Sequence, residues 1–99
     1  MSSYDTLNQH LNDEMQRLAV LINSGEHSER DRNALAKILY PKLKYFVRKY
    51  VTDEHEIEEI VNETLYKVFK GLASFNSAYR FTTWLYCIAR NEALLWIHN

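Results

Sequence analysis

Residues 53–72 read DEHEIEEIVNETLYKVFKGL and carry the most regular helical pattern in the chain. Asp53 is a favourable N-cap, and Glu56, three residues later, completes the sequence pattern of a capping box. The apolar residues recur at spacings of three and four, so they share one face of a helix. They are Ile57, Ile60, Val61, Leu65, Val68, Phe69 and Leu72. The opposite face is polar and consists of Glu56, Glu59, Asn62, Glu63, Tyr66 and Lys70. The stretch therefore predicts an amphipathic helix that packs on other helices and leaves an acidic face uncovered.

Three further helices are predicted on either side of this one. Apolar spacing predicts a helix over residues 6–23 that stops at a Ser-Gly pair, and a second over residues 29–51. Pro41 should kink or divide the second of these. The last helix should begin with Thr82 or Thr83 as its cap and run to the end of the chain. No strand-like alternation occurs, so the sequence predicts an all-α, compact helical domain of about four helices. We expect residues 1–24 to form an N-terminal helical extension and residues 25–99 the main domain, in one globular unit overall.

The amino-acid composition excludes several classes of function. The chain has 99 residues, of which 46% are hydrophobic and 25% charged, as in one small globular domain. It has no apolar run long enough to span a membrane, and its single cysteine suits a reducing cytoplasm. Two glycines cannot build a phosphate-binding loop, and the four histidines lie in separate segments. We therefore predict a cytoplasmic protein that is not an enzyme and has no cofactor, metal site or membrane partner.

Charge is distributed in blocks. Residues 34–50 carry five basic side chains and no acidic one, whereas residues 51–66 carry six acidic side chains and no basic one. The net charge of −1 hides this division. Separate blocks of opposite sign indicate more than one binding surface.

Residues 75–91, FNSAYRFTTWLYCIARN, mix aromatic side chains with two arginines. Aromatic rings and guanidinium planes can stack on unpaired bases, and basic groups can hold phosphates. Helical spacing places Thr83, Tyr86 and Arg90 outward. It assigns to the core Leu85, Ile88, Ala89, Leu95 and Trp96. The stretch is thus either a platform for a single strand, or a core segment in which the phenylalanines pack inward and the arginines are solvated.

From Leu39 onward the chain resembles region two of bacterial sigma factors, most closely the extracytoplasmic-function group (group IV). Residues 57–69, IEEIVNETLYKVF, are similar to the acidic helix of that family, which has the form A-E-D-L-V-Q-E-V-F-x-x-V-W. A second family motif, F-x-x-W-L-x-x-I-A-R-N, is matched without a gap. The matching residues are Phe81, Trp84, Leu85, Ile88, Ala89, Arg90 and Asn91. The resemblance implies a sigma-factor region two fold.

The resemblance also implies partners. In the family the acidic helix docks on a coiled coil of the largest subunit of core RNA polymerase, and the matching positions are Glu59, Asn62 and Glu63. The next segment opens the AT-rich promoter element and captures bases of the unpaired non-template strand. The residues that would bind this DNA are Phe75, Asn76, Tyr79, Arg80, Phe81, Trp84, Tyr86, Arg90 and Asn91. An anti-sigma factor is a further partner that the resemblance implies.

The C-terminal end departs from the family pattern. Leu95 and His98 stand where family members carry an aspartate and an arginine, and Leu94 and Ile97 fall on the predicted outward stripe. We expect no second sigma domain in addition to this one. One reading is therefore a transcription initiation factor domain that binds polymerase and assists promoter recognition and melting. The alternative is a free-standing sigma-like interaction module, a polymerase modulator, decoy or self-associating protein, without sequence-specific DNA reading.

Overall fold

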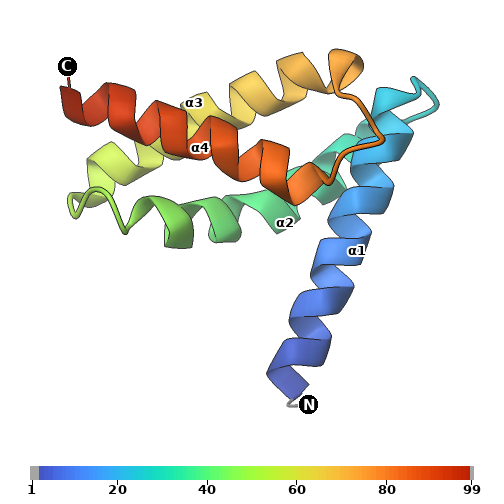
Figure 1. The fold of residues 1–99 in the computed structure, drawn as a ribbon, viewed down its shortest axis with the longest axis horizontal. Coiled ribbons are helices and arrows are strands. Elements are labelled where there is room, and N and C mark those ends of the chain that lie inside the picture. The colour runs from blue at the N-terminus through green and yellow to red at the C-terminus, as the bar shows by residue number, and fades with distance from the viewer. Residues whose placement is uncertain (1–2, 99) are drawn as a thin grey trace.

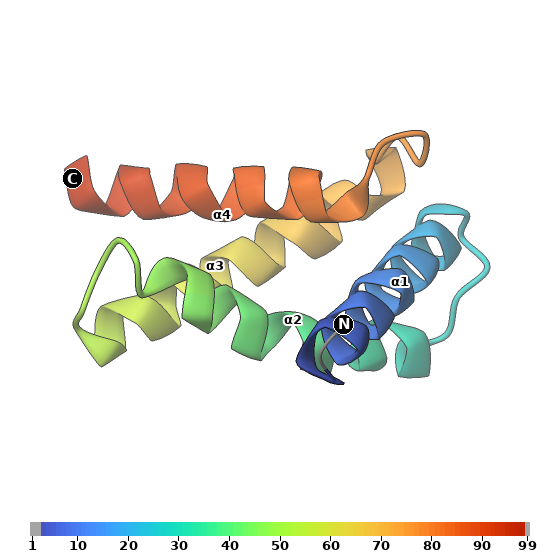
Figure 2. The same ribbon diagram turned by 60° about the horizontal axis from the view of Figure 1, so that its bottom comes forward.

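The computed structural model describes residues 3–98, which form four α-helices and one short 3₁₀ helix (Figure 1). The α-helices are α1 (Ser3–Asn23), α2 (Glu29–Val47), α3 (Glu54–Gly71) and α4 (Phe81–His98), and η1 (Leu72–Ser74) follows α3. α4 lies across α2 and α3, while α1 crosses one end of these three and its N-terminal half projects away from them (Figures 1 and 2). The predicted all-α fold of about four helices is confirmed. None of these helices is long and apolar enough to cross a membrane.

One hydrophobic core joins all four helices. The C-terminal half of α1 contributes Met15, Leu18, Ala19 and Ile22 to it. α3 buries Ile57, Ile60, Val61 and Val68 of its predicted apolar face, whereas Leu65 and Phe69 are half-buried. It also buries Thr64, whose hydroxyl donates to the carbonyl of Ile60 at 2.7 Å. The turn after α1 coincides with the predicted domain boundary at residue 24, but the core continues across it. Residues 12–23 are thus an integral part of the packed unit.

The predicted end of α1 at Asn23 and the predicted cap of α3 were correct, whereas α1 begins at Ser3 rather than at residue 6 and the cap of α2 was not predicted. α1 ends at Asn23, and Gly25 adopts a φ of +83°, a conformation that glycine accepts without a steric penalty. Asp53 caps α3 by accepting from the N–H of Glu56 at 3.0 Å. A complete reciprocal capping box, which was not predicted, forms instead at the start of α2 between Ser28 and Asp31.

Pro41 lies inside α2, so of the two predicted effects, a kink or a division of the helix, division does not occur. A proline leaves unpaired only the carbonyl four residues earlier, which here belongs to the exposed Lys37. Water can therefore replace the missing hydrogen bond. α2 ends at Val47 rather than Val51, because Lys49 and Tyr50 close short turns back to Phe46 and Val47.

The start of α4 differs from the prediction. The helix begins at Phe81, so Thr82 and Thr83 lie inside its first turn and do not cap it. The N–H of Phe81 donates instead to Oε1 of Gln16 in α1, at 2.9 Å. An amide 65 residues earlier in the chain thus satisfies one of the open donors of the helix. Local sequence patterns contain no sign of such a cap.

The buried stripe of α4 is narrower than predicted. It runs at spacings of four and faces α2 and α3. Its members are Phe81, Leu85, Ala89 and Ala93. Leu95, which was assigned to the core, is 52% exposed because it projects about 100° away from the centre of this stripe. Tyr86, which was expected to point outward, is half-buried because α2 packs against its side of α4.

Asn23, the last residue of α1, holds the segment that follows α3. Its Nδ2 donates to the carbonyl of Leu72 at 2.8 Å and to that of Phe75 at 2.6 Å. Both bonds are partly buried and bridge positions about fifty residues apart in sequence. With Gln16, this residue fixes both ends of the loop between α3 and α4.

We predict that Asn23→Ala lowers the free energy of unfolding by about 1–3 kcal/mol, because it leaves two partly buried carbonyls without their donor. Asn33→Ala is the matched control, since Asn33 is exposed on α2. Urea denaturation followed by circular dichroism measures both. Equal stability of the two variants would contradict the assigned role of Asn23.

Candidate functional site

The three residues predicted on the acidic face of α3 are all exposed. Glu59, Asn62 and Glu63 project from the side opposite the buried stripe of the helix. Nε2 of His55 lies 3.0 Å from a carboxylate oxygen of Glu59, one helical turn away. These residues form a continuous polar surface that another molecule can reach.

Other acidic residues of α3 face α2 and are paired there. Nζ of Lys44 lies 2.7 Å from Glu54 and 3.1 Å from Glu58, and Arg48 lies 3.3 Å from Glu54. The hydroxyl of Tyr40 also donates to Glu58. The hydrogen bond from Tyr40, then that from Lys44, holds the pKa of Glu58 below its usual value. The basic and acidic blocks of the sequence therefore partly neutralise each other across the α2–α3 contact, which charge counting did not predict.

Three aromatic rings pack beneath the loop between α3 and α4. The ring centroid of Phe75 lies 5.9 Å from that of Phe81, in an edge-on arrangement, and 4.9 Å from that of Trp84. Phe75 is 6% exposed and Phe81 is fully buried, so neither ring is on the surface where a base could stack. Trp84 is half-buried, and Gly71 lies so close that a Cβ there would meet its ring at 3.1 Å. The inward-packing alternative is thus correct for the two phenylalanines.

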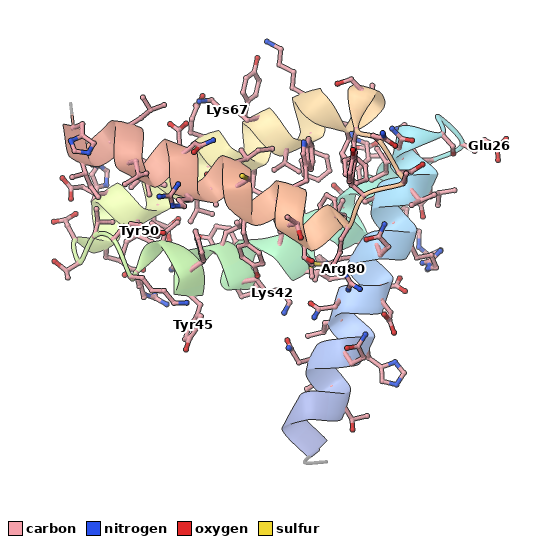
Figure 3. The ribbon with its side chains drawn as sticks, viewed as in Figure 1. Glu26, Lys42, Tyr45, Tyr50, Lys67 and Arg80 are labelled. Carbon is pink, nitrogen blue, oxygen red and sulfur yellow. The ribbon has the colours of Figure 1, made fainter. Side chains whose placement is uncertain are left out.

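The tip of the loop is exposed. Asn76 bends the chain by accepting from the N–H of Ala78 at 3.0 Å, and Tyr79 and Arg80 follow with their side chains in solvent. Arg80 lies where the loop approaches α1 (Figure 3). A polar hollow of about 370 Å³ opens here between α1 and the loop. Its lining includes Asn12, Asp13, Gln16, Ser77, Tyr79, Arg80 and Thr82.

The α4 residues of the candidate site separate into two groups. Arg90 and Asn91 are exposed, whereas the ring of Tyr86 packs against Phe46 of α2 with centroids 4.9 Å apart. Burial raises the pKa of the Tyr86 hydroxyl. Tyr86 is therefore turned toward α2 while Arg90 stays in solvent, and the two do not form the expected outward pair.

Three residues of the hollow, Asn12, Asp13 and Gln16, lie in α1 and were missed in the sequence. Asn12 and Gln16 belong to the segment that was expected to be an extension, and neither is part of a recognisable motif. Only the folded chain brings them to a loop more than sixty residues later. The loop and α1 together form the candidate binding surface.

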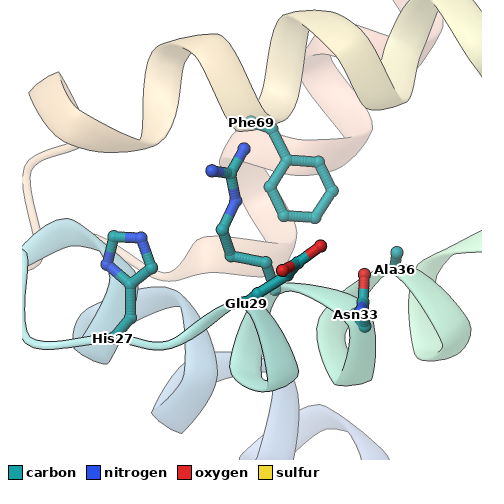
Figure 4. Close-up of a pocket in the computed structure, with 6 residues that line it drawn as sticks. His27, Glu29, Asn33, Ala36 and Phe69 are labelled. Carbon is teal, nitrogen blue, oxygen red and sulfur yellow. The ribbon is translucent and has the colours of Figure 1, made fainter.

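Another hollow, of about 550 Å³, lies beside the first two turns of α2 (Figure 4). It is lined by His27, Glu29, Arg32, Asn33, Ala36 and Phe69. The Arg32 guanidinium sits 5.6 Å from the centre of the Phe69 ring, so its charge is directed at the ring face. The lining of this hollow carries charges of both signs, from Glu29 and Arg32. Within residues 3–98 no group of three potential metal ligands occurs.

Comparison with known proteins shows a family whose sequences match this chain and a solved structure with a similar fold. The sequence model of the Sigma-70 region 2 family matches residues 35–98. The fold is similar to the NMR structure of an engineered region 2 of sigmaE in complex with GTAAAA. The TM-score is 0.73, the sequences are 29% identical, and the match covers 84% of each chain. A comparison with curated protein sequences gave no match.

The ion pairs between α2 and α3 predict a pH dependence of stability. The pKa values of Glu54 and Glu58 are lowered from 4.5 in the folded chain, so their pairing with Lys44 stabilises the fold above that pH. The contribution disappears as the pH falls through the lowered values. Lys44→Gln should therefore lower the free energy of unfolding at pH 7 but not at pH 2.

Urea denaturation of both proteins at the two pH values measures this difference. Lys70→Gln is the control, because Lys70 is exposed on α3 and its described neighbour is the uncharged ring of Tyr66. A loss of stability for Lys44→Gln that is the same at both pH values would show that the ion pairs do not contribute.

Proposed function

The chain belongs to the Sigma-70 region 2 family, and we propose that it binds core RNA polymerase and assists recognition and melting of the AT-rich promoter element. The family is that of a transcription initiation factor domain. One observation supports the proposed binding of promoter DNA. The exposed loop and α1 enclose a polar hollow beside Tyr79 and Arg80, and packed aromatic rings support the loop from beneath.

For polymerase, we propose contact through Glu59, Asn62 and Glu63 with the coiled coil of the largest subunit. Their exposure supports this role, since they can approach a partner without repacking the core. Glu54 and Glu58 are excluded from the contact because they are engaged with Lys44. A basic partner surface would complement the remaining acidic face.

For DNA, we propose that an unpaired base of the non-template strand enters the hollow between the loop and α1. Tyr79 offers a flat face for stacking, and Arg80 and Arg90 offer charge to the phosphates. Gln16 uses its Oε1 to cap α4, which leaves its Nε2 donors to read a base edge. Phe75, Phe81 and Trp84 hold the loop in place, and Asn76 shapes its bend.

Melting then requires no covalent chemistry. A surface that binds unpaired bases and not paired ones shifts the equilibrium toward the open duplex by its differential affinity. The similarity to a sigmaE region 2 in complex with GTAAAA supports this proposal and supplies a probe of defined sequence.

A second candidate function rests on the C-terminal end of α4. Leu95 and Ile97 are 52% and 47% exposed and give this end an apolar surface. Such a surface favours a self-associating module without sequence-specific DNA reading. Light scattering at high concentration tests this candidate, and a strictly monomeric chain would rule it out.

We predict that Glu59→Lys plus Glu63→Lys weakens binding to core RNA polymerase by about tenfold or more, because like charges then meet across the contact. A pull-down with purified core enzyme measures the retained fraction. Glu26→Lys plus Glu29→Lys is the control, with the same change in charge at exposed positions before and at the start of α2. Equal retention of the two double variants would argue against this face.

We predict that Arg80→Ala plus Arg90→Ala lowers affinity for single-stranded GTAAAA by about tenfold. The slope of log affinity against log salt should also fall by about 1.4, the value for two lost phosphate contacts on a single strand. Fluorescence anisotropy of a labelled oligonucleotide measures both quantities. Arg30→Ala plus Lys70→Ala removes the same charge elsewhere on the surface and should change neither. An unchanged salt slope in the first variant would refute the assigned contacts.

A further inference from the structure

A groove of about 870 Å³ is lined by residues of the N-terminal half of α1, of α2 and of α4. We call it the α1–α2 groove. Its walls are mainly aliphatic and aromatic and include Leu7, Leu11, Ile38, Pro41 and Phe46. Leu7 is 60% exposed, so α1 presents an apolar side chain across the groove with no helix packed on it. This surface lies on the opposite side of α2 from the hollow beside Phe69.

The charge of the groove has one sign. Lys37, Lys42 and Lys49 line it, and no acidic residue is among its described lining. Nζ of Lys42 donates to Oδ1 of Asn8 at 3.1 Å, which bridges the two walls. Nζ of Lys49 lies 5.7 Å from the centre of the Tyr45 ring and 5.6 Å from that of Phe46. The lysines therefore follow the apolar walls along the length of the groove.

We propose that the α1–α2 groove binds an acidic amphipathic helix of a partner protein. Aliphatic walls accept leucine or phenylalanine side chains from one face of such a helix, and the lysines pair with carboxylates on its flanks. Lys37 lies on α2 and Lys49 lies two residues past its end, and the helix from Lys37 to Val47 alone spans about 15 Å along its axis. A bound helix of about three turns would reach from one to the other.

The chemistry of the walls favours a helix over a nucleic acid strand. Leu7, Leu11 and Ile38 offer neither a flat stacking face nor a hydrogen-bonding edge to a base. The aromatic rings of the groove are already engaged, since Phe46 packs on Tyr86 with centroids 4.9 Å apart and Lys49 lies over the ring of Tyr45. The hollow beside Arg80 differs in this respect, because amide and hydroxyl groups line it. The partner also differs from polymerase in charge, since the acidic face of α3 calls for a basic surface. The groove is thus a third surface, independent of the two in the proposed function.

The test uses a fluorescein-labelled helix-forming peptide of about sixteen residues, with Leu and Phe on one face and Glu on the flanks. We expect anisotropy to show micromolar binding to the full chain. A scrambled peptide of the same composition should bind at least about tenfold more weakly, because it has no apolar face. Lys37→Glu plus Lys49→Glu should weaken peptide binding about tenfold, and Leu7→Ser about fivefold. Arg30→Glu plus Lys70→Glu carries the same charge change outside the groove and should bind as the native chain does.

Several results would overturn the proposal. These are failure of the native chain to bind the peptide, equal binding of the scrambled peptide, and equal weakening by the control variant. Circular dichroism of every variant separates loss of binding from loss of fold, and Leu7→Ser changes an exposed side chain that the core does not need.

A parallel titration with GTAAAA separates this proposal from the proposed function. The Lys37 and Lys49 double variant should keep its affinity for the oligonucleotide. If it loses the oligonucleotide and retains the peptide, the lysines belong to the nucleic-acid surface and the proposal is wrong. Loss of the oligonucleotide in the Arg80 and Arg90 double variant tests the proposed function alone.

Discussion

Two side-chain amides of α1 determine the shape of the loop that forms the proposed DNA-binding surface. Asn23 donates to the carbonyls of Leu72 and Phe75 where the loop leaves α3, and Gln16 accepts from the N–H of Phe81 where α4 begins. A loop of this length would otherwise lose conformational entropy on ordering without compensation. Because both ends are fixed and the aromatic rings pack beneath, the exposed tip can be rigid without being buried itself.

The same domain keeps surfaces of opposite charge apart. Pairing between α2 and α3 uses Lys44 and Arg48 with Glu54 and Glu58, so the charges in the middle of the molecule are largely satisfied internally. What remains is acidic on the outer face of α3 and basic along the outer face of α2. Since the two faces lie on different sides of the α2–α3 pair, partners of opposite charge can bind without sharing a surface.

Helical periodicity was sufficient for the four helices, the buried face of α3 and the Asp53 cap, because these depend on residues close in sequence. It failed where a distant element decides the outcome. Thr82 and Thr83 are good caps by type, yet Gln16 takes that role, and Leu95 is apolar but projects away from both neighbouring helices. The candidate site shows the same limit: the exposure of Tyr79 and Arg80 follows from the pattern, whereas the contribution of Asn12 and Gln16 depends on tertiary contacts.

The long reach of Gln16 and Asn23 also bears on how the domain forms. α1 is synthesised first, but its hydrogen-bond partners lie between residues 72 and 81. Contacts of such sequence separation form slowly, because a long segment must close before they contribute. On the ribosome Gln16 and Asn23 must therefore wait for their partners until residues 72–81 have emerged, whereas α1, α2 and α3, which are adjacent in sequence, can pack on one another before then. The loop would acquire its final shape last, in the step that completes the fold.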